Sequence, residues 1–243
     1  MGGHRLLTAV VAGLLTSAAQ LANAADLAVP APIAPAFSWT GCYAGAQLGG
    51  GALQDGYTAA ANPSVIGPSG SPSSNLGTQW GFGVLGGAQL GCNYQIGHFV
   101  VGIESDAWGS SLETQSNVAT FGHSGTANAS TTNPYDFDLA GRFGIAYDEA
   151  FFYGKAGLAV GGFNYNYTSF YAAQSGTSTS PGVLIGLGIE YAIWSEWTVK
   201  FETDFLLFSS PNVNLACTGC TSATSTISNS EVLFKLGVNY KFY

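Results

Sequence analysis

The chain ends on EVLFKLGVNYKFY (Glu231–Tyr243), and in this stretch every second residue from Phe234 to Phe242 is apolar. Lys235 and Lys241 lie in the opposite phase. Because neighbouring side chains of a β-strand point to opposite faces, this alternation predicts a strand with one apolar and one polar face. The fold depends on what the apolar face is buried against.

The amino-acid composition is unusual for a protein that faces water on all sides. Only 8% of the residues are charged, whereas 47% are hydrophobic and 13% are aromatic. An ordinary soluble domain has about 25% charged residues. The composition therefore indicates that much of the surface contacts something other than water.

The first residues of the chain are typical of an export signal. A short basic segment, MGGHR, precedes the apolar stretch Leu6–Ala22, and Ala22-Asn23-Ala24 forms a typical cleavage site. An N-terminal membrane anchor is the alternative, but no stop-transfer sequence follows the apolar stretch. We therefore expect a signal peptide at 1–24, a Pro-rich periplasmic segment at 25–37 and one folded domain at 38–243.

Eight segments with alternating apolar and polar residues follow the Pro-rich segment. Each is close to the ~9–11 residues that a tilted strand needs to cross a bilayer. The segments span residues 38–50, 82–96, 99–109, 135–147, 151–164, 183–193, 197–208 and 231–242. We expect them to be the strands of a single antiparallel sheet.

The links between these segments alternate between short and long. Tight turns are expected near Gly97-His98, Asp148–Ala150 and Ser195-Glu196. The other links are rich in Ser, Thr, Asn and Gly, and we predict loops at 51–81, 110–134, 165–182 and 209–230. Outer-membrane barrels have this asymmetry, with short periplasmic turns and longer external loops. Soluble lipocalins also have eight strands, so the rhythm alone does not separate the two classes.

The phase of the charged residues favours the transmembrane class. In 99–109, for example, Glu104 and Asp106 alternate with Ile103 and Ala107. A Lys or Arg at the lipid midplane costs about 2–4 kcal/mol, so a lipid-facing wall requires an uninterrupted apolar phase. We therefore predict an all-β fold, an eight-stranded antiparallel up-and-down transmembrane β-barrel with an ionic network in its lumen. The predicted luminal charged residues are Glu104, Asp106, Asp138, Arg142, Lys155, Glu190, Lys200, Glu202, Asp204 and Lys235.

Aromatic residues are frequent near the ends of the segments. In transmembrane barrels such residues form girdles at the two membrane interfaces. Packing in an ordinary core is the alternative, but the crowding around the turns favours girdles. The predicted girdle residues are Trp39, Tyr43, Tyr94, Phe99, Tyr147, Phe152, Tyr191, Trp194, Trp197 and Tyr240.

Several stretches, taken together, are similar to those of a known family. They are WTGCYAGAQLGG (Trp39–Gly50), GGAQLGCNYQIGHFVVGIESD (Gly86–Asp106), GRFGIAYDEAFFYGKAGLAVGG (Gly141–Gly162), GLGIEYAIWSEWTVKFE (Gly186–Glu202) and LGVNYKFY (Leu236–Tyr243). The chain resembles the alphaproteobacterial outer-membrane β-barrel proteins of the "porin family" or surface-antigen type, which belong to the OmpA-like eight-stranded class.

The resemblance implies a protein of the Gram-negative outer membrane, in contact with outer-membrane lipids and lipopolysaccharide. It also implies periplasmic chaperones and the barrel-assembly machinery as partners during biogenesis, and host or environmental surfaces as ligands. Members of the family usually end on an aromatic residue that the assembly machinery reads. Phe242 corresponds to that residue, so the resemblance implies an assembly signal at Tyr240, Phe242 and Tyr243, with Tyr243 out of phase.

Export permits disulfides, and Cys42 and Cys92 are one candidate pair. If they pair, the first two strands are set in a register that keeps one phase aligned, with Ala44 opposite Leu90, Ala46 opposite Ala88 and Leu48 opposite Gly86. Directly opposed residues bring their Cα atoms within disulfide range. Two free thiols that behave as small apolar residues are the alternative.

Cys217 and Cys220 form a C-x-x-C motif in the last predicted loop. Structural zinc needs four ligands, and no further Cys or His cluster accompanies the motif. A thioredoxin-like role needs a βαβ context, which is absent. We therefore predict a local disulfide and no metal site.

The sequence offers little for catalysis or cofactor binding. Only His98 and His123 follow the signal peptide, and no strand-borne Ser or Asp is arranged to serve either. Without Arg5 the chain has five basic residues against 14 acidic ones and no basic patch, so nucleic acid is a poor partner. We expect no enzyme and no cofactor.

The leading hypothesis is an integral outer-membrane barrel with a structural and surface-exposed role, as an adhesin or antigen. The alternative is a narrow porin for passive diffusion of small solutes. Eight strands enclose an interior just wide enough for side chains to fill, which favours the first hypothesis. A soluble lipocalin-like binder, the third class, would be recovered without detergent.

Overall fold

In the computed structural model the described residues are 37–59, 75–119, 126–168, 173–217 and 223–242. They belong to one compact unit, Phe37–Tyr243. The predicted signal peptide at 1–24 lies outside the described residues. No helix in the described part of the chain is long and apolar enough to cross a membrane. The strands are β1 (Gly41–Ala59), β2 (Asn75–Ile96), β3 (Phe99–Ala119), β4 (Thr126–Tyr147), β5 (Ala150–Thr168), β6 (Ala173–Ala192), β7 (Trp197–Phe208), β8 (Asn212–Cys217) and β9 (Ala223–Phe242).

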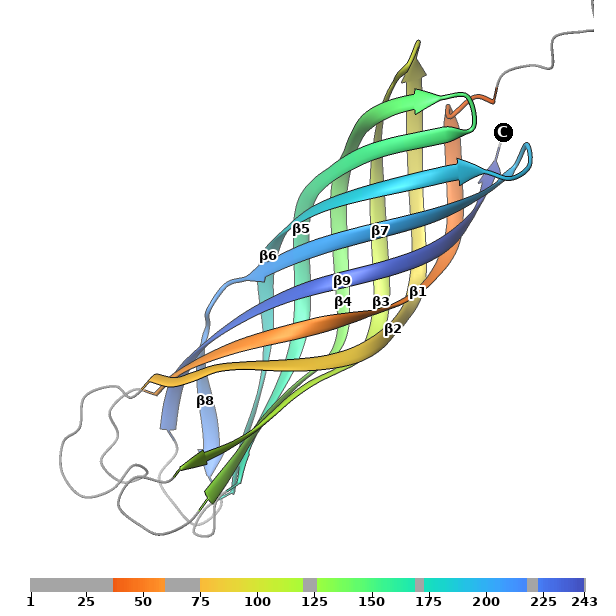
Figure 1. Cartoon of the computed structure of the whole chain (residues 1–243). Coiled ribbons are helices and arrows are strands. Elements are labelled where there is room, and N and C mark those ends of the chain that lie inside the picture. Colours follow the sequence, from red (N-terminus) through yellow and green to blue (C-terminus); the bar gives the residue numbers. More distant parts are fainter. Residues whose placement is uncertain (1–36, 60–74, 120–125, 169–172, 218–222, 243) are drawn as a thin grey trace, which may run out of the picture. The chain divides into compact units, whose positions relative to one another are not determined.

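These strands form one closed antiparallel sheet (Figure 1). Each strand from β1 to β6 pairs with the next, β7 pairs with β9, and β9 pairs back with β1. The short strand β8 follows β7 and pairs with the outer part of β9, so β7 and β8 share one position in the ring. The predicted eight-stranded antiparallel barrel is therefore confirmed, with one position divided between two strands.

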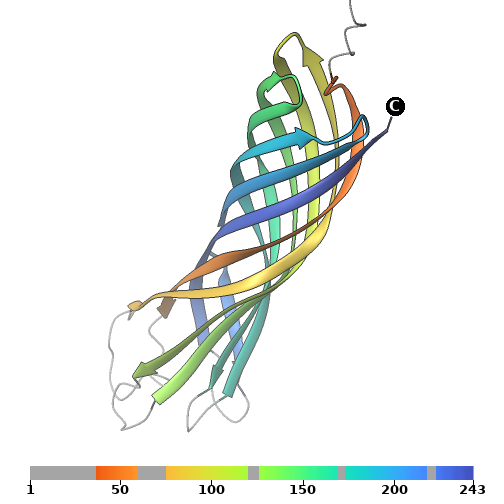
Figure 2. The ribbon, with the colours of Figure 1, turned by 45° about the vertical axis from the view of Figure 1, so that its right-hand side comes forward.

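The three predicted tight turns are also confirmed. They lie at Gly97-His98 between β2 and β3, at Asp148-Glu149 between β4 and β5, and at residues 193–196 between β6 and β7. All three lie at the same end of the barrel as the start of β1 and the end of β9 (Figures 1 and 2). We call this end the turn end and the opposite end the outer end.

The strands are much longer than the sequence pattern predicts. β1 to β6 and β9 have 19 to 22 residues each. The pairing of β3 with β4 continues from Phe99 opposite Ile145 to Ala119 opposite Thr126. The expectation of loops is therefore wrong for most of the described residues in the ranges 51–81, 110–134, 165–182 and 209–230.

Main-chain hydrogen bonds explain why these ranges are strands. The N–H and C=O groups of paired strands continue to match beyond the apolar segments, whatever the side chains are. Ser, Thr and Asn there leave no apolar alternation, and that alternation was the signal used to predict strands. One strand does stop early: β7 ends at Phe208, and Pro211, which has no N–H to donate, stands between β7 and β8.

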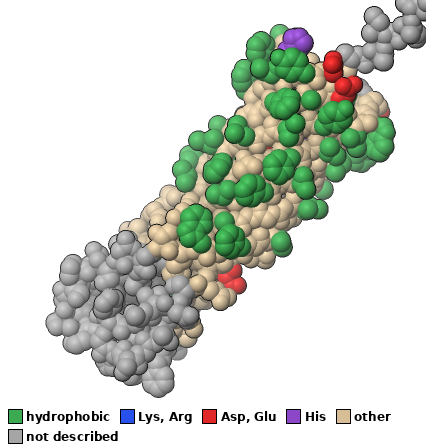
Figure 3. Space-filling model, viewed as in Figure 1, with side chains coloured by type: hydrophobic (Ala, Val, Ile, Leu, Met, Phe, Trp, Pro, Cys, Tyr) green, Lys and Arg blue, Asp and Glu red, His purple; other side chains and the backbone are tan. Residues whose placement is uncertain are grey.

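The apolar phase of each strand lies on the outside of the barrel. In β9, Phe234, Leu236 and Val238 are 42% to 57% exposed, whereas Lys235 is fully buried. On the face shown in Figure 3, apolar side chains cover the wall, and acidic side chains appear only near its ends. The apolar face of the terminal strand is therefore directed outward and not into a core.

The pattern reverses toward the outer end. In the segment Ser110–Gln115 of β3, Leu112 and Thr114 are buried, whereas Ser111 and Glu113 are exposed. A cluster of apolar side chains fills the interior at this level and consists of Leu53, Leu85, Trp108, Leu112, Ala129, Ala140, Ala159, Phe163, Tyr165, Leu184, Leu206, Phe208, Val213, Ile227 and Leu233. The outer part of the barrel therefore packs most of its large apolar side chains inside and exposes polar ones, as in a soluble barrel.

Eight of the ten predicted girdle aromatics are exposed on the outer surface. The prediction is wrong for Trp39 and Tyr43, whose exposed fractions are only 2% and 4%. Tyr43 shares the inward phase of β1 with Gln47, and Trp39 precedes β1 and packs on Phe151 with ring centroids 5.2 Å apart. The phase of a residue, and not its distance from a strand end, decides which face it joins.

Candidate functional site

The ten predicted luminal charged residues all lie inside the barrel, and none is more than 4% exposed. Strand alternation directs them there, because each shares its phase with other inward residues of its strand. We call them the ionic plug. β3 carries Glu104 and Asp106, β4 carries Asp138 and Arg142, β5 carries Lys155, β6 carries Glu190, β7 carries Lys200, Glu202 and Asp204, and β9 carries Lys235.

Arg142 organises the part of the plug nearest the turn end. Its two terminal nitrogens lie 3.1 Å from Glu104 Oε2 and 2.7 Å from Glu190 Oε2. Tyr43 donates its hydroxyl hydrogen to Glu104 Oε2 at 2.6 Å and accepts a hydrogen bond from Arg142. The guanidinium carbon lies 3.9 Å from the ring centroid of Tyr153. The planar guanidinium therefore connects four other strands.

Three lysines organise the rest of the plug. Lys155 Nζ lies 2.6 Å from Asp106 Oδ2 and 2.9 Å from Glu202 Oε1. Lys235 Nζ lies 2.9 Å from the same Glu202 oxygen. Lys200 donates to Glu104 Oε1 at 3.2 Å, and this contact joins the lysines to the Arg142 group. Ammonium groups from three strands thus share carboxylates from β3 and β7.

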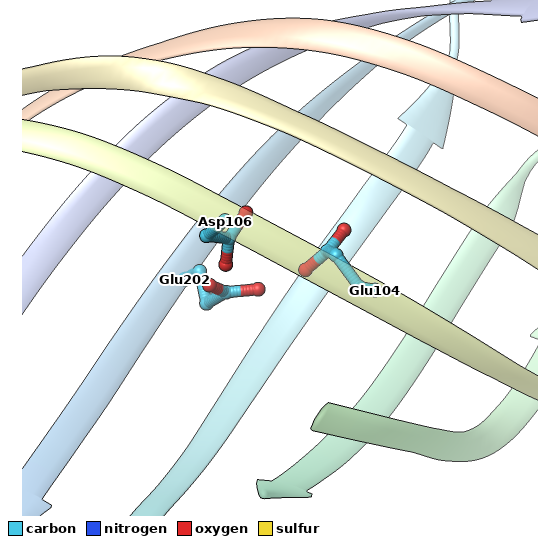
Figure 4. Close-up of side chains that lie close together, drawn as sticks. All are labelled: Glu104, Asp106 and Glu202. Atoms are coloured by element: carbon cyan, nitrogen blue, oxygen red, sulfur yellow. The ribbon is translucent and has the colours of Figure 1, made fainter. Parts of the chain in front are cut away.

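Three carboxylates converge in the lumen (Figure 4). One oxygen from each of Glu104, Asp106 and Glu202 lies within 4.8 Å of the other two. Asp106 belongs to a second such set with Asp138 and Asp204. Such convergence is found in cation sites, but the Lys155 ammonium already contacts both sets. The protein therefore supplies the positive charge at this point from its own side chain.

The plug is demanding in energetic terms. A complete buried ion pair is weak evidence for stability, because desolvation offsets the attraction. Removal of one partner is strongly destabilising, by about 3–5 kcal/mol, because it leaves an unpaired buried charge. The plug therefore favours one arrangement of the strands that carry it, and its buried side chains fill the middle of the lumen.

An apolar cluster lies in the interior at the turn end and consists of Trp39, Val100, Ala146, Phe151, Tyr153 and Ala192. The segment before β1 is held against it. Trp39 N donates to Gln95 Oε1 at 2.8 Å, and Trp39 Nε1 donates to the carbonyl oxygen of Asp148 at 3.3 Å. Lys241 donates to the carbonyl oxygen of Ser38. With the apolar cluster of the outer end, side chains thus fill the described interior at three levels.

Three further carboxylates are buried toward the outer end from the plug. Asp55, Asp136 and Glu231 are at most 2% exposed. Asn133 Nδ2 donates to Asp136 Oδ1 at 3.0 Å and to Glu231 Oε1 at 2.6 Å, and Thr114 donates to Asp55. In these contacts the donors are the amide of Asn133 and the hydroxyl of Thr114, whereas lysines are the main donors in the plug.

Sequence reasoning missed these three residues for identifiable reasons. Asp136 shares the phase of Asp138, and Glu231 shares the phase of Lys235, so the phase rule itself would have found both. Asp55 lies in a range that was predicted as a loop, where the phase rule was not applied. The phase of a charged residue thus predicts whether its side chain points into the lumen over a longer part of each strand than apolar alternation does.

The predicted disulfide between Cys42 and Cys92 is confirmed, with the two sulfurs 2.09 Å apart. The register is the predicted one, with Ala44 opposite Leu90 and Ala46 opposite Ala88. Both cysteines lie on the outer surface of the barrel near the turn end. The predicted bond between Cys217 and Cys220 lies outside the described residues, because position 220 is not described.

The residues of the expected assembly signal lie at the end of β9. Tyr240 and Phe242 are 36% and 47% exposed on the outer surface, and Tyr243 lies outside the described residues. The Tyr240 ring contacts both the Phe242 ring and the Trp197 ring of β7, with centroids 5.4 Å and 5.1 Å apart. The recognition of these residues by assembly factors stays a prediction.

Sequence comparison relates the chain to proteins of outer membranes. The family described as outer membrane protein beta-barrel domain matches residues 8–242. The 31 kDa outer-membrane immunogenic protein of Brucella melitensis biotype 1 is 31% identical over 247 residues, which cover 96% of this chain and 98% of the relative. The 22 kDa outer membrane protein of Rhizobium leguminosarum bv. viciae is 28% identical over 216 residues, which cover 87% of this chain and 82% of the relative.

Structure comparison finds a similar fold in the outer membrane protease OmpT from Escherichia coli. The TM-score is 0.51 with 9% sequence identity, and the match covers 86% of this chain and 99% of OmpT. At this level of identity the likeness concerns the fold alone.

Proposed function

Because this chain belongs to the outer membrane protein beta-barrel family, we propose that it is a structural component of the outer membrane that presents its outer end as a surface antigen or adhesin. Its location is the bacterial outer membrane, as the family and both relatives agree. The proposal concerns what the barrel does there, and it includes no catalytic step.

The filled lumen is the observation that carries this proposal. The ten charged residues of the ionic plug are at most 4% exposed, and apolar clusters lie on both sides of them. An eight-stranded barrel has an interior just wide enough for side chains to fill. A barrel whose interior is occupied in this way offers its outer surface, and not its lumen, for contact with other molecules.

The extension of the strands supports a surface role. At about 3.3 Å per residue, a strand of about 20 residues is twice as long as the ~9–11 residues that cross a bilayer. Beyond the apolar wall the outward phase becomes polar, as at Ser111, Glu113 and Gln115 of β3. The outer end therefore projects a folded, water-compatible wall above the lipid.

Expected partners follow from this placement. Outer-membrane lipids and lipopolysaccharide would surround the apolar wall, and chaperones with the barrel-assembly machinery would act during biogenesis. The ligand of the outer end would be a host or environmental surface. One relative is called an immunogenic protein, which supports an antigen role for the same end of this chain.

Cysteine labelling on intact cells tests the orientation that the proposal requires. Gln115→Cys and Glu149→Cys place a thiol on exposed positions near the outer end and at a tight turn, in a background with Cys217→Ser and Cys220→Ser. A membrane-impermeant maleimide should label Gln115→Cys on intact cells and Glu149→Cys only after permeabilisation. Labelling of Glu149→Cys alone on intact cells would contradict the proposal.

Antibody binding tests the surface role itself. Antibodies against the purified barrel should bind intact producing cells, and those cells should adhere to host or environmental surfaces more than cells without the protein. Equal binding and equal adhesion of both cell types would overturn the antigen and adhesin roles. The alternative, a narrow porin for small solutes, requires a path through the plug and is tested by conductance.

A further inference from the structure

The disulfide joins β1 to β2 beside the seam where the first strand, β1, pairs with the last strand, β9. Cys42 of β1 is directly opposite Cys92 on one side and directly opposite Phe242 of β9 on the other. All three side chains are exposed on the outer surface. To close the ring, β9 must pair with β1. The disulfide fixes β1 to β2 at Cys42, the residue of β1 that pairs with Phe242 at the end of β9.

The outward side chains of β1 specify its register weakly. A shift by one residue would move every outward residue into the lumen and is excluded for that reason. A shift by two residues keeps each face, and on the outer face, which consists of Cys42, Ala44, Ala46, Leu48, Gly50 and Ala52, it exchanges small residues at every position except Leu48. Gly-rich strands of this kind are prone to slippage.

The inward contacts of β1 that would resist such a shift reach strands other than β2: Tyr43 bonds to Glu104 of β3 and Arg142 of β4, and Asp55 accepts a hydrogen bond from Thr114 of β3. Gln89 of β2 donates to Asn239 Oδ1 of β9 at 2.7 Å, and this bond passes over Gly45. A Cβ atom at position 45 would collide with both side chains. A two-residue shift would bring Tyr43 or Gln47 to this point and break the bond. All these bonds join β1 or β2 to β3, β4 or β9, so they act on the register of β1 only after those strands are in place.

We propose that the Cys42–Cys92 disulfide sets the register of β1 before the barrel closes. The two thiols are oxidised to one disulfide, and two electrons and two protons pass to the disulfide of an exported thiol oxidoreductase, which becomes a dithiol. The bond joins residues 50 positions apart and leaves β1 and β2 with a single register. β9 then pairs with a strand whose register on β2 is already fixed.

This inference goes beyond the proposed surface role and does not depend on it. It assigns two positioning residues and one class of partner, a protein thiol oxidant that acts on the exported chain. Reduction before closure would leave β1 free to pair in shifted registers. Reduction after closure would change little, because β9 and β2 then hold β1 on both edges.

A folding assay with a relocated bond tests the inference. Cys42→Ser with Cys92→Ser removes the disulfide from the full chain, and Ala46→Cys with Ala88→Cys restores a bond at a directly opposed outward pair four residues along the same ladder. Folding from urea into liposomes is followed by heat-modifiable gel mobility. Three face-preserving registers are open without the bond, so folding should slow by about threefold.

The relocated bond should restore the rate when oxidised and not in the presence of dithiothreitol. A matched control, Cys217→Ser with Cys220→Ser, should fold at the parental rate. The relocated bond also keeps the test decisive if the double serine variant does not fold at all. Failure of the oxidised Ala46→Cys/Ala88→Cys chain to recover, or an unchanged rate without any bond, would overturn the inference.

A cross-linking readout separates register from mere stabilisation. Leu48 lies opposite Leu236 in the closed barrel, so Leu48→Cys with Leu236→Cys should link with or without the native disulfide. Leu48→Cys with Val238→Cys links only after a two-residue shift. Mass spectrometry should find this second link as a minor product in the Cys42→Ser/Cys92→Ser chain, several-fold above its trace level in the parental chain. Equal amounts in both chains would contradict the inference.

Discussion

Arg142 illustrates how single residues hold this barrel together. It bonds to Glu104 of β3 and to Glu190 of β6, and its guanidinium packs on the Tyr153 ring of β5. Its side chain is fully buried, so every polar contact that it makes replaces one with water. At this scale the protein depends on charge compensation, because each buried carboxylate is tolerable only with its donor.

Arg142→Met should therefore lower the free energy of unfolding by about 3–5 kcal/mol, because buried Glu190 loses its ion pair and buried Glu104 keeps Lys155 and Lys200 but loses its guanidinium partner. Urea titration in detergent, followed by gel mobility, measures the change. Glu113→Gln removes a charge from an exposed position and should change the free energy by less than about 0.5 kcal/mol. If Arg142→Met unfolds at the parental urea concentration, the plug does not stabilise the barrel.

The outward phase gives a second prediction for single residues. Leu158 of β5 is 70% exposed on the apolar wall, and Asn166 lies on the same strand and the same face toward the outer end. Leu158→Arg should cost about 2–4 kcal/mol, because it places a cation in lipid. Asn166→Arg should leave stability and membrane assembly close to parental. The two arginines should thus differ in heat-modifiable yield, and similar yields would mean that the wall is misplaced.

At the scale of the strand, one element has two different surroundings. β3 exposes Ile103 on the apolar wall and buries Glu104, whereas farther along it exposes Glu113 and buries Leu112. The backbone pairing is continuous over both parts apart from an irregularity after Gly109. The surroundings of the outer face change from lipid to water along the strand. The outward side chains therefore change from apolar to polar, and apolar side chains appear on the inward face.

Leu112→Ala is predicted to destabilise the outer part of the barrel by about 2–5 kcal/mol, because it opens a cavity among packed side chains. Glu113→Ala, one position away and exposed, should stay within about 0.5 kcal/mol of parental. Urea unfolding measures the destabilisation by Leu112→Ala, and limited proteolysis shows whether it is confined to the outer part of the barrel. If residues 110–134 were a loop, the two substitutions would have equally small effects.

At the scale of the whole molecule, side chains fill the interior of the ring over the part of the chain that the structure describes. Apolar side chains, the ionic plug and a second apolar cluster follow one another along the described interior. We therefore expect purified protein in planar bilayers to give no steady open current. A porin of 16–18 strands, which has an aqueous channel, is the positive control. Steady currents from the wild-type chain would favour the narrow-porin alternative.

Much of this arrangement was predictable from individual residues. The alternation of Phe234 and Lys235 indicated a wall strand, and the spacing of Cys42 and Cys92 indicated the register of the first pair, since both depend only on the period of two. The inward position of Tyr43 was accessible by the same rule and was missed, because nearness to a turn was given more weight than phase.

The amino-acid sequence by itself determined the ring, the direction of each apolar face and the residues that enter the lumen, because phase along a strand is a local property. Only the tertiary structure decided which carboxylate meets which cation, how far the strands continue past the lipid, and that Trp39 folds into the lumen at the turn end. These features join residues that are far apart along the chain, 109 positions in the Trp39–Asp148 bond and 129 in the Lys235–Asp106 ion pair. They depend on closure, since only the closed ring places strands that are distant in sequence around one interior.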